Sequence, residues 1–542
     1  MKTIRLFWIF LFIPFLLQAQ DWDWATSWGG TSDDHARGMA IGNHNDVYVA
    51  GTFRGVLFTP IDTLISNGSR DAILTKLNQT TGEIVWIRTI GGPEADVSEP
   101  VVLDSAGNIY YCGLFTSVMN INGSPVFTNG SSDIFLAKYD TAGTLLWLKT
   151  YGGNGADYIS HFSYTRDHHL VFAGYFTETL QMDTISIPSG GKYDGMIGKM
   201  DLDGNVLWVS SLGGPGDERL FQAYEAPDGS FYSHGDMNDT FTVGTETFKT
   251  AGYIDALTTR WDQNGNLLWV RQGGGTMTDQ PTSGTVDNDG NYYIAGYFGL
   301  GAQFGEIVLN HVDDQEGFII KYQPDGTEAW ATTINGNGGS YFYSIDYVND
   351  DALFFSGKLQ GSPTWENQSW TGINETDIFY GKINSQGKLL WGAFEGGPKL
   401  ESGWRIKWKD DYAYMLGWFE DTCNIGTHQV VSKGGLDAYI TRRHFPFYAT
   451  DIEKEKLSEF SFNVFPNPNQ GSFQLDTDIS IFTQTNLNLY DINGRMVKQW
   501  QVTPTTPFPL SLETRDLTPG VYFLRLGVHS SQTLSQKIII TE

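Results

Sequence analysis

Residues 133–153 read DIFLAKYDTAGTLLWLKTYGG, and this stretch decides the fold class. Asp133 opens an apolar run that ends at Tyr139, and a turn around Gly143 follows. A second apolar run, centred on Trp147, then ends in the glycine pair at 152–153. Short apolar runs separated by glycine turns predict two adjacent antiparallel strands.

The same pattern recurs along the chain in one phase, which establishes an internal repeat. Its tryptophan recurs with one step of 62 residues and then five of 61: Trp24, Trp86, Trp147, Trp208, Trp269, Trp330 and Trp391. The acidic residue recurs as Asp71, Asp133, Asp194, Asp255, Glu316, Asp377 and Asp437. A glycine that ends another apolar run recurs as Gly51, Gly113, Gly174, Gly235, Gly296, Gly357 and Gly417.

Each repeat is predicted to form about four strands, and no segment has the sustained 3.6-residue period of a helix. Four short strands in each of seven repeats of about 60 residues are typical of propeller blades. The chain is therefore predicted to be all-β, with a seven-bladed β-propeller over residues 22–443. After residues 437–443 no tryptophan strand follows, whereas an unpartnered one lies at 22–28. We expect this N-terminal strand to complete the last blade.

The repeat resembles the bacterial seven-bladed propeller repeat across residues 22–443. Residues 77–86, LNQTTGEIVW, are similar to the tryptophan-docking motif of quinoprotein dehydrogenase propellers. Those enzymes resemble an eight-bladed ring with a vicinal cysteine pair above the quinone. Here the count is seven, and Cys112 and Cys423 lie far apart. We therefore expect the blade packing of that family, but neither its cofactor nor a disulfide framework.

The N-terminus has the features of a signal peptide, predicted over residues 1–19. Lys2 and Arg5 supply the positive end, and the apolar run from Leu6 to Leu17 is too short to span a bilayer comfortably. No later stretch is long and apolar enough for a transmembrane helix.

Residues 444–460 are predicted to be a linker, and residues 461–542 a small β-sandwich. This last region contains FPNP at 465–468, LYDINGR at 489–495 and LTPGVYFLR at 517–525. In that order the motifs resemble the type A sorting domain of type IX secretion. The resemblance implies the type IX machinery as a partner, a secreted or outer-membrane location, removal of this domain and frequent attachment to lipopolysaccharide. The final Thr541-Glu542 departs from the basic residue often found there.

Composition excludes some partners but names none. The formal net charge of −28 over 542 residues would repel a nucleic acid. No His-Glu-x-x-His pair, Gly-x-Ser-x-Gly elbow or phosphate loop is present. The residues thus favour a protein that is not an enzyme, without excluding one.

A second acidic series follows the glycine pairs. Its members are Asp34, Asp96, Asp157, Glu218, Asp279 and Glu401, with Ser340 at the remaining position. These carboxylates could ring one mouth of the central channel, where clustered oxygens suit Ca²⁺. Alternatively, each could hold its own crossing loop in place. The DNDGN turn at 287–291 resembles the start of a calcium loop but lacks the final Glu, which favours a hairpin turn.

Just after the acidic series the repeats stop resembling each other, and this is where a ligand site is predicted. The candidate ligand-binding residues are Tyr158, His161, Arg219, Phe221, Tyr341, Tyr343, Trp404 and Arg405. Aromatic rings beside charged donors could bind a glycan or a peptide, or they could simply fill the channel. We expect such a ligand on the face that carries the crossings after the glycine pairs.

Three functions follow as hypotheses. The first is a surface-displayed binding or adhesion module. The second is a carbohydrate-active or redox enzyme that uses the mouth of the channel. The third is a purely structural surface protein, and fold alone does not choose among them.

Overall fold

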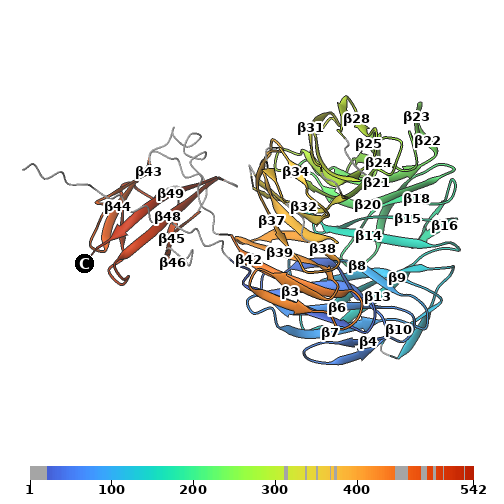
Figure 1. Cartoon of the computed structure of the whole chain (residues 1–542), viewed down its shortest axis with the longest axis horizontal. Coiled ribbons are helices and arrows are strands. Elements are labelled where there is room, and N and C mark those ends of the chain that lie inside the picture. The colour runs from blue at the N-terminus through green and yellow to red at the C-terminus, as the bar shows by residue number, and fades with distance from the viewer. Residues whose placement is uncertain are drawn as a thin grey trace, which may run out of the picture.

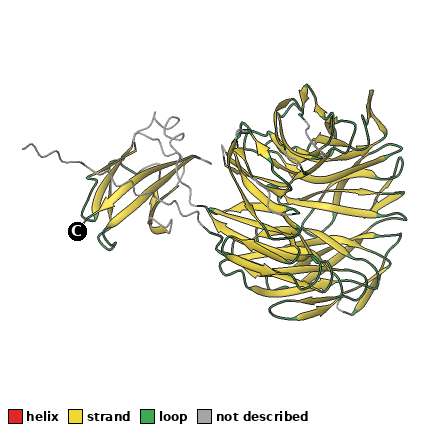
Figure 2. Ribbon diagram, viewed as in Figure 1, coloured by secondary structure: helices red, strands yellow, loops and turns green. Residues whose placement is uncertain are grey.

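The computed structural model describes residues 21–121, 123–310, 315–335, 338–349, 352–366, 368–370, 375–445, 462–477, 485–491, 496–503, 506–529 and 532–541. The expected signal peptide at 1–19 and most of the expected linker at 444–460 lie outside these residues. The described residues form strands and loops without a helix, as Figure 2 shows. None of them therefore belongs to a helix that could cross a membrane.

The repeats form seven antiparallel sheets of four principal strands each, and we number them 1 to 7 by their first strands. In sheets 4 and 7 a short hairpin of the neighbouring repeat pairs with the last principal strand and extends the sheet to six strands. Sheet 1 has the order β2 (His35–Ile41), β3 (Asp46–Phe53), β6 (Asp71–Asn78), β7 (Ile84–Ile90). Sheet 2 has the order β8 (Val97–Leu103), β9 (Ile109–Phe115), β12 (Asp133–Tyr139), β13 (Leu145–Tyr151). Sheet 3 has the order β14 (Asp157–Tyr164), β15 (Leu170–Phe176), β18 (Asp194–Met200), β19 (Val206–Leu212). Sheet 4 has the order β20 (Asp217–Glu225), β21 (Phe231–Asn238), β24 (Asp255–Trp261), β25 (Leu267–Gly274). Sheets 5 to 7 are β26 (Gln280–Val286), β27 (Tyr292–Phe298), β30 (Glu316–Tyr322), β31 (Glu328–Ile334); β32 (Ser340–Asn349), β33 (Ala352–Leu359), β36 (Asp377–Ile383), β37 (Leu389–Glu395); and β38 (Glu401–Lys409), β39 (Tyr412–Phe419), β42 (Asp437–His444), β1 (Trp24–Gly30).

A short hairpin also interrupts the segment between the second and third strands of each sheet. The hairpins are β4 (Val56–Phe58) with β5 (Thr63–Ile65), β10 (Val118–Ile121) with β11 (Ser124–Phe127), β16 (Thr179–Met182) with β17 (Ile185–Pro188), β22 (Thr240–Val243) with β23 (Glu246–Lys249), β28 (Gln303–Phe304) with β29 (Ile307–Val308), β34 (Thr364–Trp365) with β35 (Gln368–Ser369), and β40 (Thr422–Ile425) with β41 (His428–Val431). In each sheet, one turn joins the first strand to the second and another joins the third to the fourth; these turns lie on one face of the ring, which we call the turn face. The hairpins and the segments that cross to the next sheet lie on the opposite face, which we call the crossing face.

The N-terminal strand completes the last sheet, which confirms the prediction. Strand β1 pairs antiparallel with β42, from Trp24 opposite Arg442 to Trp28 opposite Ala438. An ion pair of 2.7 Å between Arg442 and Asp23 reinforces the junction. In Figure 1 the orange strands β38, β39 and β42 lie beside the blue strands β3 and β6. The two ends of the repeat region are thus neighbours in space.

The repeated tryptophans connect neighbouring sheets at the turn face. The Trp86 indole N–H donates to the carbonyl of Thr141 in the turn of the next sheet, at 3.3 Å. The same bond, 55 residues ahead, joins Trp24 to Gln79, Trp269 to Pro324 and Trp330 to Ser385. Gly143 in that turn has a φ of 78°, and a Cβ there would lie 2.9 Å from the Trp86 ring. The glycine is therefore required by the turn and by the ring packed on it.

The first acidic series has a structural role on the crossing face. Asp133 is fully buried, and its Oδ2 accepts the Asn129 N–H at 2.9 Å. Equivalent bonds from the residue four positions earlier reach Asp71, Asp194, Asp255 and Asp437. Gly152 of the glycine pair lies against the Asp133 carboxylate, which leaves no room for a Cβ. The glycine pair and the acidic residue are thus two halves of one contact.

The C-terminal region forms two further antiparallel sheets. One has the order β43 (Phe462–Phe465), β44 (Ser472–Thr477), β47 (Leu510–Glu513). The other has the order β46 (Met496–Val502), β45 (Thr485–Asp491), β48 (Gly520–His529), β49 (Gln532–Ile540). Buried residues of both sheets, including Phe473, Leu512, Leu487 and Leu524, belong to one hydrophobic cluster. Along β44 buried and exposed residues alternate, which is typical of a strand with one face on a core.

Candidate functional site in the central channel

The first strands of the seven sheets, β2, β8, β14, β20, β26, β32 and β38, share an irregularity that shapes the channel. Each has a β-bulge at the same position of the repeat. The bulged residues are Arg37, Glu99 with Pro100, Ser160, Phe221, Thr282, Tyr343 and Trp404. A bulge re-aims the side chains that follow it. Seven different side chains at the seven equivalent positions therefore make the channel asymmetric.

Three of the predicted ligand-binding residues form an aromatic cluster near the crossing face. The Tyr343 ring lies 6.0 Å from that of Tyr341 and 5.0 Å from that of Trp404. Trp404 in turn packs at 4.9 Å on Trp418. The Lys358 ammonium lies 4.5 Å from the centre of the Tyr341 ring, and burial lowers the pKa of this lysine. These rings therefore pack on each other and on neighbouring side chains.

Other predicted residues at this end are held by partners that the sequence did not indicate. The Arg219 guanidinium donates two bonds to Asp236, of 2.9 and 2.7 Å, and lies 5.5 Å from the Phe221 ring. Tyr158 packs at 5.4 Å on Tyr175. Arg219 is therefore paired with the buried Asp236, which compensates its charge.

The second acidic series is buried against backbone amides. Asp279 accepts the N–H groups of Gly275 and Gly299, at 2.7 and 3.0 Å. Gly30, Gly92, Gly153 and Gly214 donate in the same way to Asp34, Asp96, Asp157 and Glu218. Burial is the main cause that raises the pKa of these five carboxyls to about 7, and of Glu401 to about 8. These contacts favour the alternative in which each carboxylate holds its own crossing loop.

The described residues also contain no cluster of three or more His, Cys, Asp or Glu side chains placed to hold a metal ion. Within the DNDGN turn, Asp287 Oδ1 accepts the N–H groups of Asp289 and Asn291, at 3.0 and 2.8 Å. The Gly290 N–H bonds to the Asp287 carbonyl. This stretch is therefore a hairpin turn whose carboxylate is occupied by its own backbone.

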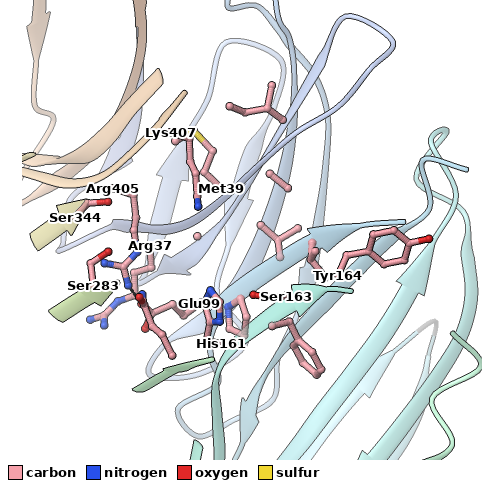
Figure 3. Close-up of a pocket in the computed structure, with 18 of the residues that line it drawn as sticks. Arg37, Met39, Glu99, His161, Ser163, Tyr164, Ser283, Ser344, Arg405 and Lys407 are labelled. Atoms are coloured by element: carbon pink, nitrogen blue, oxygen red, sulfur yellow. Dashed lines mark hydrogen bonds and ion pairs between the residues drawn. The ribbon is translucent and has the colours of Figure 1, made fainter. Parts of the chain in front are cut away.

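A cavity of about 410 Å³ lies in the half of the channel nearer the turn face. All seven first strands contribute to its wall, and Figure 3 shows Arg37, Glu99, His161, Arg405 and Lys407 around it. A second cavity, of about 270 Å³, shares residues 41, 103, 164 and 409 with the first and extends among the turns. The main cavity thus lies toward the opposite end of the channel from the face on which a ligand was expected.

At two positions of the repeat, sheets 1 and 2 line this cavity with residues whose side chains have no polar group. Gly38 and Ala40 of sheet 1, with Pro100 and Val102 of sheet 2, line it. Polar residues of varied size stand at the equivalent positions of the other sheets, namely His161, Gln222, Ser283, Ser344 and Arg405, and Ser163, Tyr224, Thr285, Asp346 and Lys407. Many of these bond to the next first strand. For example, the Ser163 hydroxyl donates to the Ala223 carbonyl at 2.7 Å.

Two ion pairs lie in the polar wall. Arg405 donates to Glu99 Oε1 at 2.8 Å and to the Tyr343 carbonyl at 3.0 Å. Lys407 lies 3.4 Å from Asp346 Oδ1, and this carboxylate raises the pKa of the lysine. Asp346 Oδ2 also accepts the Trp408 N–H at 2.7 Å. A carboxylate partner therefore holds each of these two cations in position.

His161 is a neutral donor in this wall. Burial first, and then the charges of Lys407 and Arg405, hold the pKa of its imidazole well below the usual value. Its Nδ1 accepts the Ala223 N–H at 3.3 Å, so the ring proton must be on Nε2. The ring also packs at 4.7 Å on Tyr224. His161 can therefore donate a hydrogen bond but is not available as a base at Nδ1.

Of the eight predicted residues, only His161 and Arg405 line the main cavity. The other six lie on the same first strands, in the part nearer the crossing face. Sequence reasoning missed Arg37, Glu99, Lys407 and Lys409, which also line the cavity. Aligning the repeats on the second acidic series and comparing the third to sixth residues after it would have indicated the first three, because the copies differ most there.

Comparison with known proteins identifies the C-terminal region. Residues 463–541 match the family described as secretion system C-terminal sorting domain, which confirms the sorting-domain prediction. This domain indicates export by the type IX secretion system to the cell surface or the extracellular space.

The repeat region has more distant similarities. The chain is 21% identical over 470 residues to an uncharacterized WD repeat-containing protein of Acanthamoeba polyphaga mimivirus, and the match covers 68% of this chain and 34% of that protein. It is similar to the quinohemoprotein alcohol dehydrogenase of Comamonas testosteroni at 11% identity and a TM-score of 0.35, over 75% of this chain and 66% of the enzyme. It is also similar to a puromycin hydrolase at 10% identity and a TM-score of 0.40, over 82% of this chain and 58% of that one. The chain spans about a third of the viral relative's length and less than two thirds of the hydrolase.

Proposed function

We propose that this chain is a non-catalytic binding module: a seven-bladed β-propeller over residues 22–443 that holds a small ligand in its central channel. In this proposal residues 1–19 are a signal peptide, residues 444–460 a linker, and residues 461–542 a β-sandwich that serves export. The exported propeller then acts at the cell surface or in the surrounding medium.

The asymmetry of the channel within a regular ring carries this proposal. The tryptophan contacts and the buried carboxylates recur from sheet to sheet, because they hold the sheets together. At the bulges the copies instead present arginine, glutamate, serine, phenylalanine, threonine, tyrosine and tryptophan. Packing alone would tolerate one repeated residue at these positions, whereas a specific ligand needs different groups at different places.

The polar groups around the cavity support binding over catalysis. The Ser160 and Ser163 hydroxyls donate to the carbonyls of Phe221 and Ala223, at 2.8 and 2.7 Å. His161 uses Nδ1 for a backbone N–H, and Glu99 is paired with Arg405. A nucleophile needs a base within hydrogen-bond reach. Among the residues of this wall, no serine is bonded to His161 or Glu99.

A binding screen on the secreted chain tests the proposal. Glycans, peptides and small metabolites would be ranked by the rise in melting temperature, and hits measured by calorimetry. Ala40→Phe, which fills the cavity, should abolish binding, whereas Ala142→Phe at an exposed turn should not. Product formation from a hit would overturn the non-catalytic assignment, and unchanged binding in Ala40→Phe would overturn the channel site.

The aromatic cluster near the crossing face requires a separate test, because it contains three of the six predicted residues that lie outside the cavity. Tyr341→Ala and Trp404→Ala should weaken ligand binding if the cluster extends the site. A melting temperature that falls while affinity is unchanged would instead assign these rings to packing alone.

A further inference from the structure

We infer that the cavity binds a small organic carboxylate whose apolar part lies against sheets 1 and 2. This inference rests on the proposed function, since it requires the channel to be a binding site. It adds the chemical class of the ligand.

The charges around the cavity favour an anion. Arg37, Arg405, Lys407 and Lys409 line it, and Glu99 is the only carboxylate that does so in the part of the chain that the structure describes. Glu99 compensates Arg405, and Asp346, which lies behind the wall, compensates Lys407. Two positive charges thus have no carboxylate partner among the described residues, although the whole chain carries −28. A local excess of positive charge in so acidic a protein requires a counterion.

Arg37 is the cation best placed to bind it. Lys409 donates to the carbonyls of Ile41 and Gly42, at 3.0 and 2.8 Å, and so holds the end of sheet 1. Arg37 makes a cation–π contact instead, 5.9 Å from the centre of the Trp404 ring, and its Nε is buried without a hydrogen-bond partner in the described structure. A guanidinium with free donors forms paired hydrogen bonds with a carboxylate. Figure 3 shows the Arg37 and Arg405 side chains close together at one end of the cavity.

The rest of the wall fits the apolar part of such a ligand. Ala40, Val102 and Leu103 line the side formed by sheets 1 and 2. These side chains offer no hydrogen bond, so a sugar placed against them would lose bonds to water on that side. A flat or branched hydrocarbon group would instead remove apolar surface from water. The cavity therefore combines a cationic end with an apolar side.

Size and access agree with a small ligand. About 410 Å³ is in the range of pockets that enclose small molecules, roughly 300 to 1,000 Å³. The second cavity leads from Ile41 and Leu103 toward Asn43 and His44, which are exposed at the turn face. We therefore expect the ligand to enter from that face.

The test compares phenylacetate with its neutral analogue phenylacetamide, by calorimetry on the secreted chain; benzoate and hexanoate extend the set. A carboxylate should bind at least about ten-fold more tightly than the amide. Arg37→Met should remove this preference, and Arg37→Lys should retain part of it. Arg166→Met is the matched control, because it also removes one positive charge, but from an exposed turn on the turn face, from which the ligand is expected to enter. Its carboxylate affinity should be unchanged.

Three results would overturn the inference: equal affinity for the acid and the amide, an unchanged preference in Arg37→Met, or no binding of any of the three carboxylates. Binding of a neutral compound that Ala40→Phe abolishes would leave the channel as a binding site and reject only the carboxylate. If Arg37→Met fails to fold, the preference for the acid is instead tested with Arg37→Lys and with a salt titration of the parent protein. Affinity for the acid should then fall with salt while affinity for the amide does not.

Discussion

The contacts between sheets and the walls of the channel follow opposite rules in the same ring. Between sheets, Trp24, Trp86, Trp269 and Trp330 repeat one hydrogen bond to a turn 55 residues ahead. In the channel, the residues at equivalent positions differ from sheet to sheet, and the seven first strands together line a cavity. The repeated contacts hold the sheets together in a closed ring, whereas the varied side chains determine which chemical groups the channel presents. Stability should therefore depend mainly on the first region, and ligand binding on the second.

Removing residues 21–30 should have the largest effect. This deletion removes β1, including Trp24, which packs in the junction of sheets 7 and 1, and it exposes the edge of β42. We expect a large loss of cooperativity and of melting temperature in calorimetry. Thr26→Val, which removes only a hydroxyl bond to Gly82, is the control. A deletion variant that melts like the parent would contradict closure through β1.

Trp269→Ala should cost the next largest amount, about 3–5 kcal/mol of unfolding free energy. The substitution removes a ring that packs at 5.9 Å on Tyr232 and donates to Pro324 of the next sheet. Trp404→Ala, which removes a partly buried ring that makes no hydrogen bond to the next sheet among the described residues, should cost only about 1 kcal/mol. Denaturant unfolding of both variants measures the difference directly. Equal losses would show that the channel is as important for packing as the contacts between sheets.

The buried carboxylates should make stability fall as pH rises from about 4 to about 8. Their pKa is raised to about 7 by burial, so between these values the folded chain binds more protons than the unfolded chain. Glu218 is the best test, because its buried Oε1 has no hydrogen-bond partner among the described residues, while Oε2 accepts the Gly214 N–H. Glu218→Gln should melt roughly 2 °C above the parent at pH 8, with the gap closing at pH 5. A pH-independent difference would contradict this explanation.

Removing residues 461–542 should have the smallest effect on the ring and the greatest on export. These strands have their own hydrophobic cluster, separate from the clusters of the repeats. We expect the shortened chain to melt like the parent but to be absent from the cell surface and the medium, as measured by fractionation. A variant with reversed outcomes, lower melting but normal export, would contradict the division of the chain.

Much of the fold could be predicted from the sequence because the repeat makes each argument seven times. The missing tryptophan strand after Arg443 was enough to pair β1 with β42, and that pairing is confirmed. The hairpins such as β4 with β5 were not predicted, because strands of three residues leave little periodicity. The carboxylates at Asp34 and Asp279 were recognised as a series, but their hydrogen bonds depend on a backbone that only the structure provides.

The site was less predictable, since it depends on what is absent. Aromatic residues such as Tyr341 and Trp404 are readily proposed as ligand-binding residues from a sequence, whereas Gly38 and Ala40, which line the cavity, are not. The bulges also change which residues face the channel, so simple alternation along a strand gives the wrong set after Arg37. The assignment of the predicted ligand residues remains a prediction.

Strand β42 gives the ring a further property, because the chain continues from it to the C-terminal domain. It is an inner strand of sheet 7, bonded to β39 on one side and to β1 on the other. Tension applied through the C-terminal end is therefore shared by two rows of backbone hydrogen bonds. Without β1 the pulled strand would be an edge, held by one row. Closing the ring with its own N-terminus thus also gives the protein a mechanically anchored point of attachment.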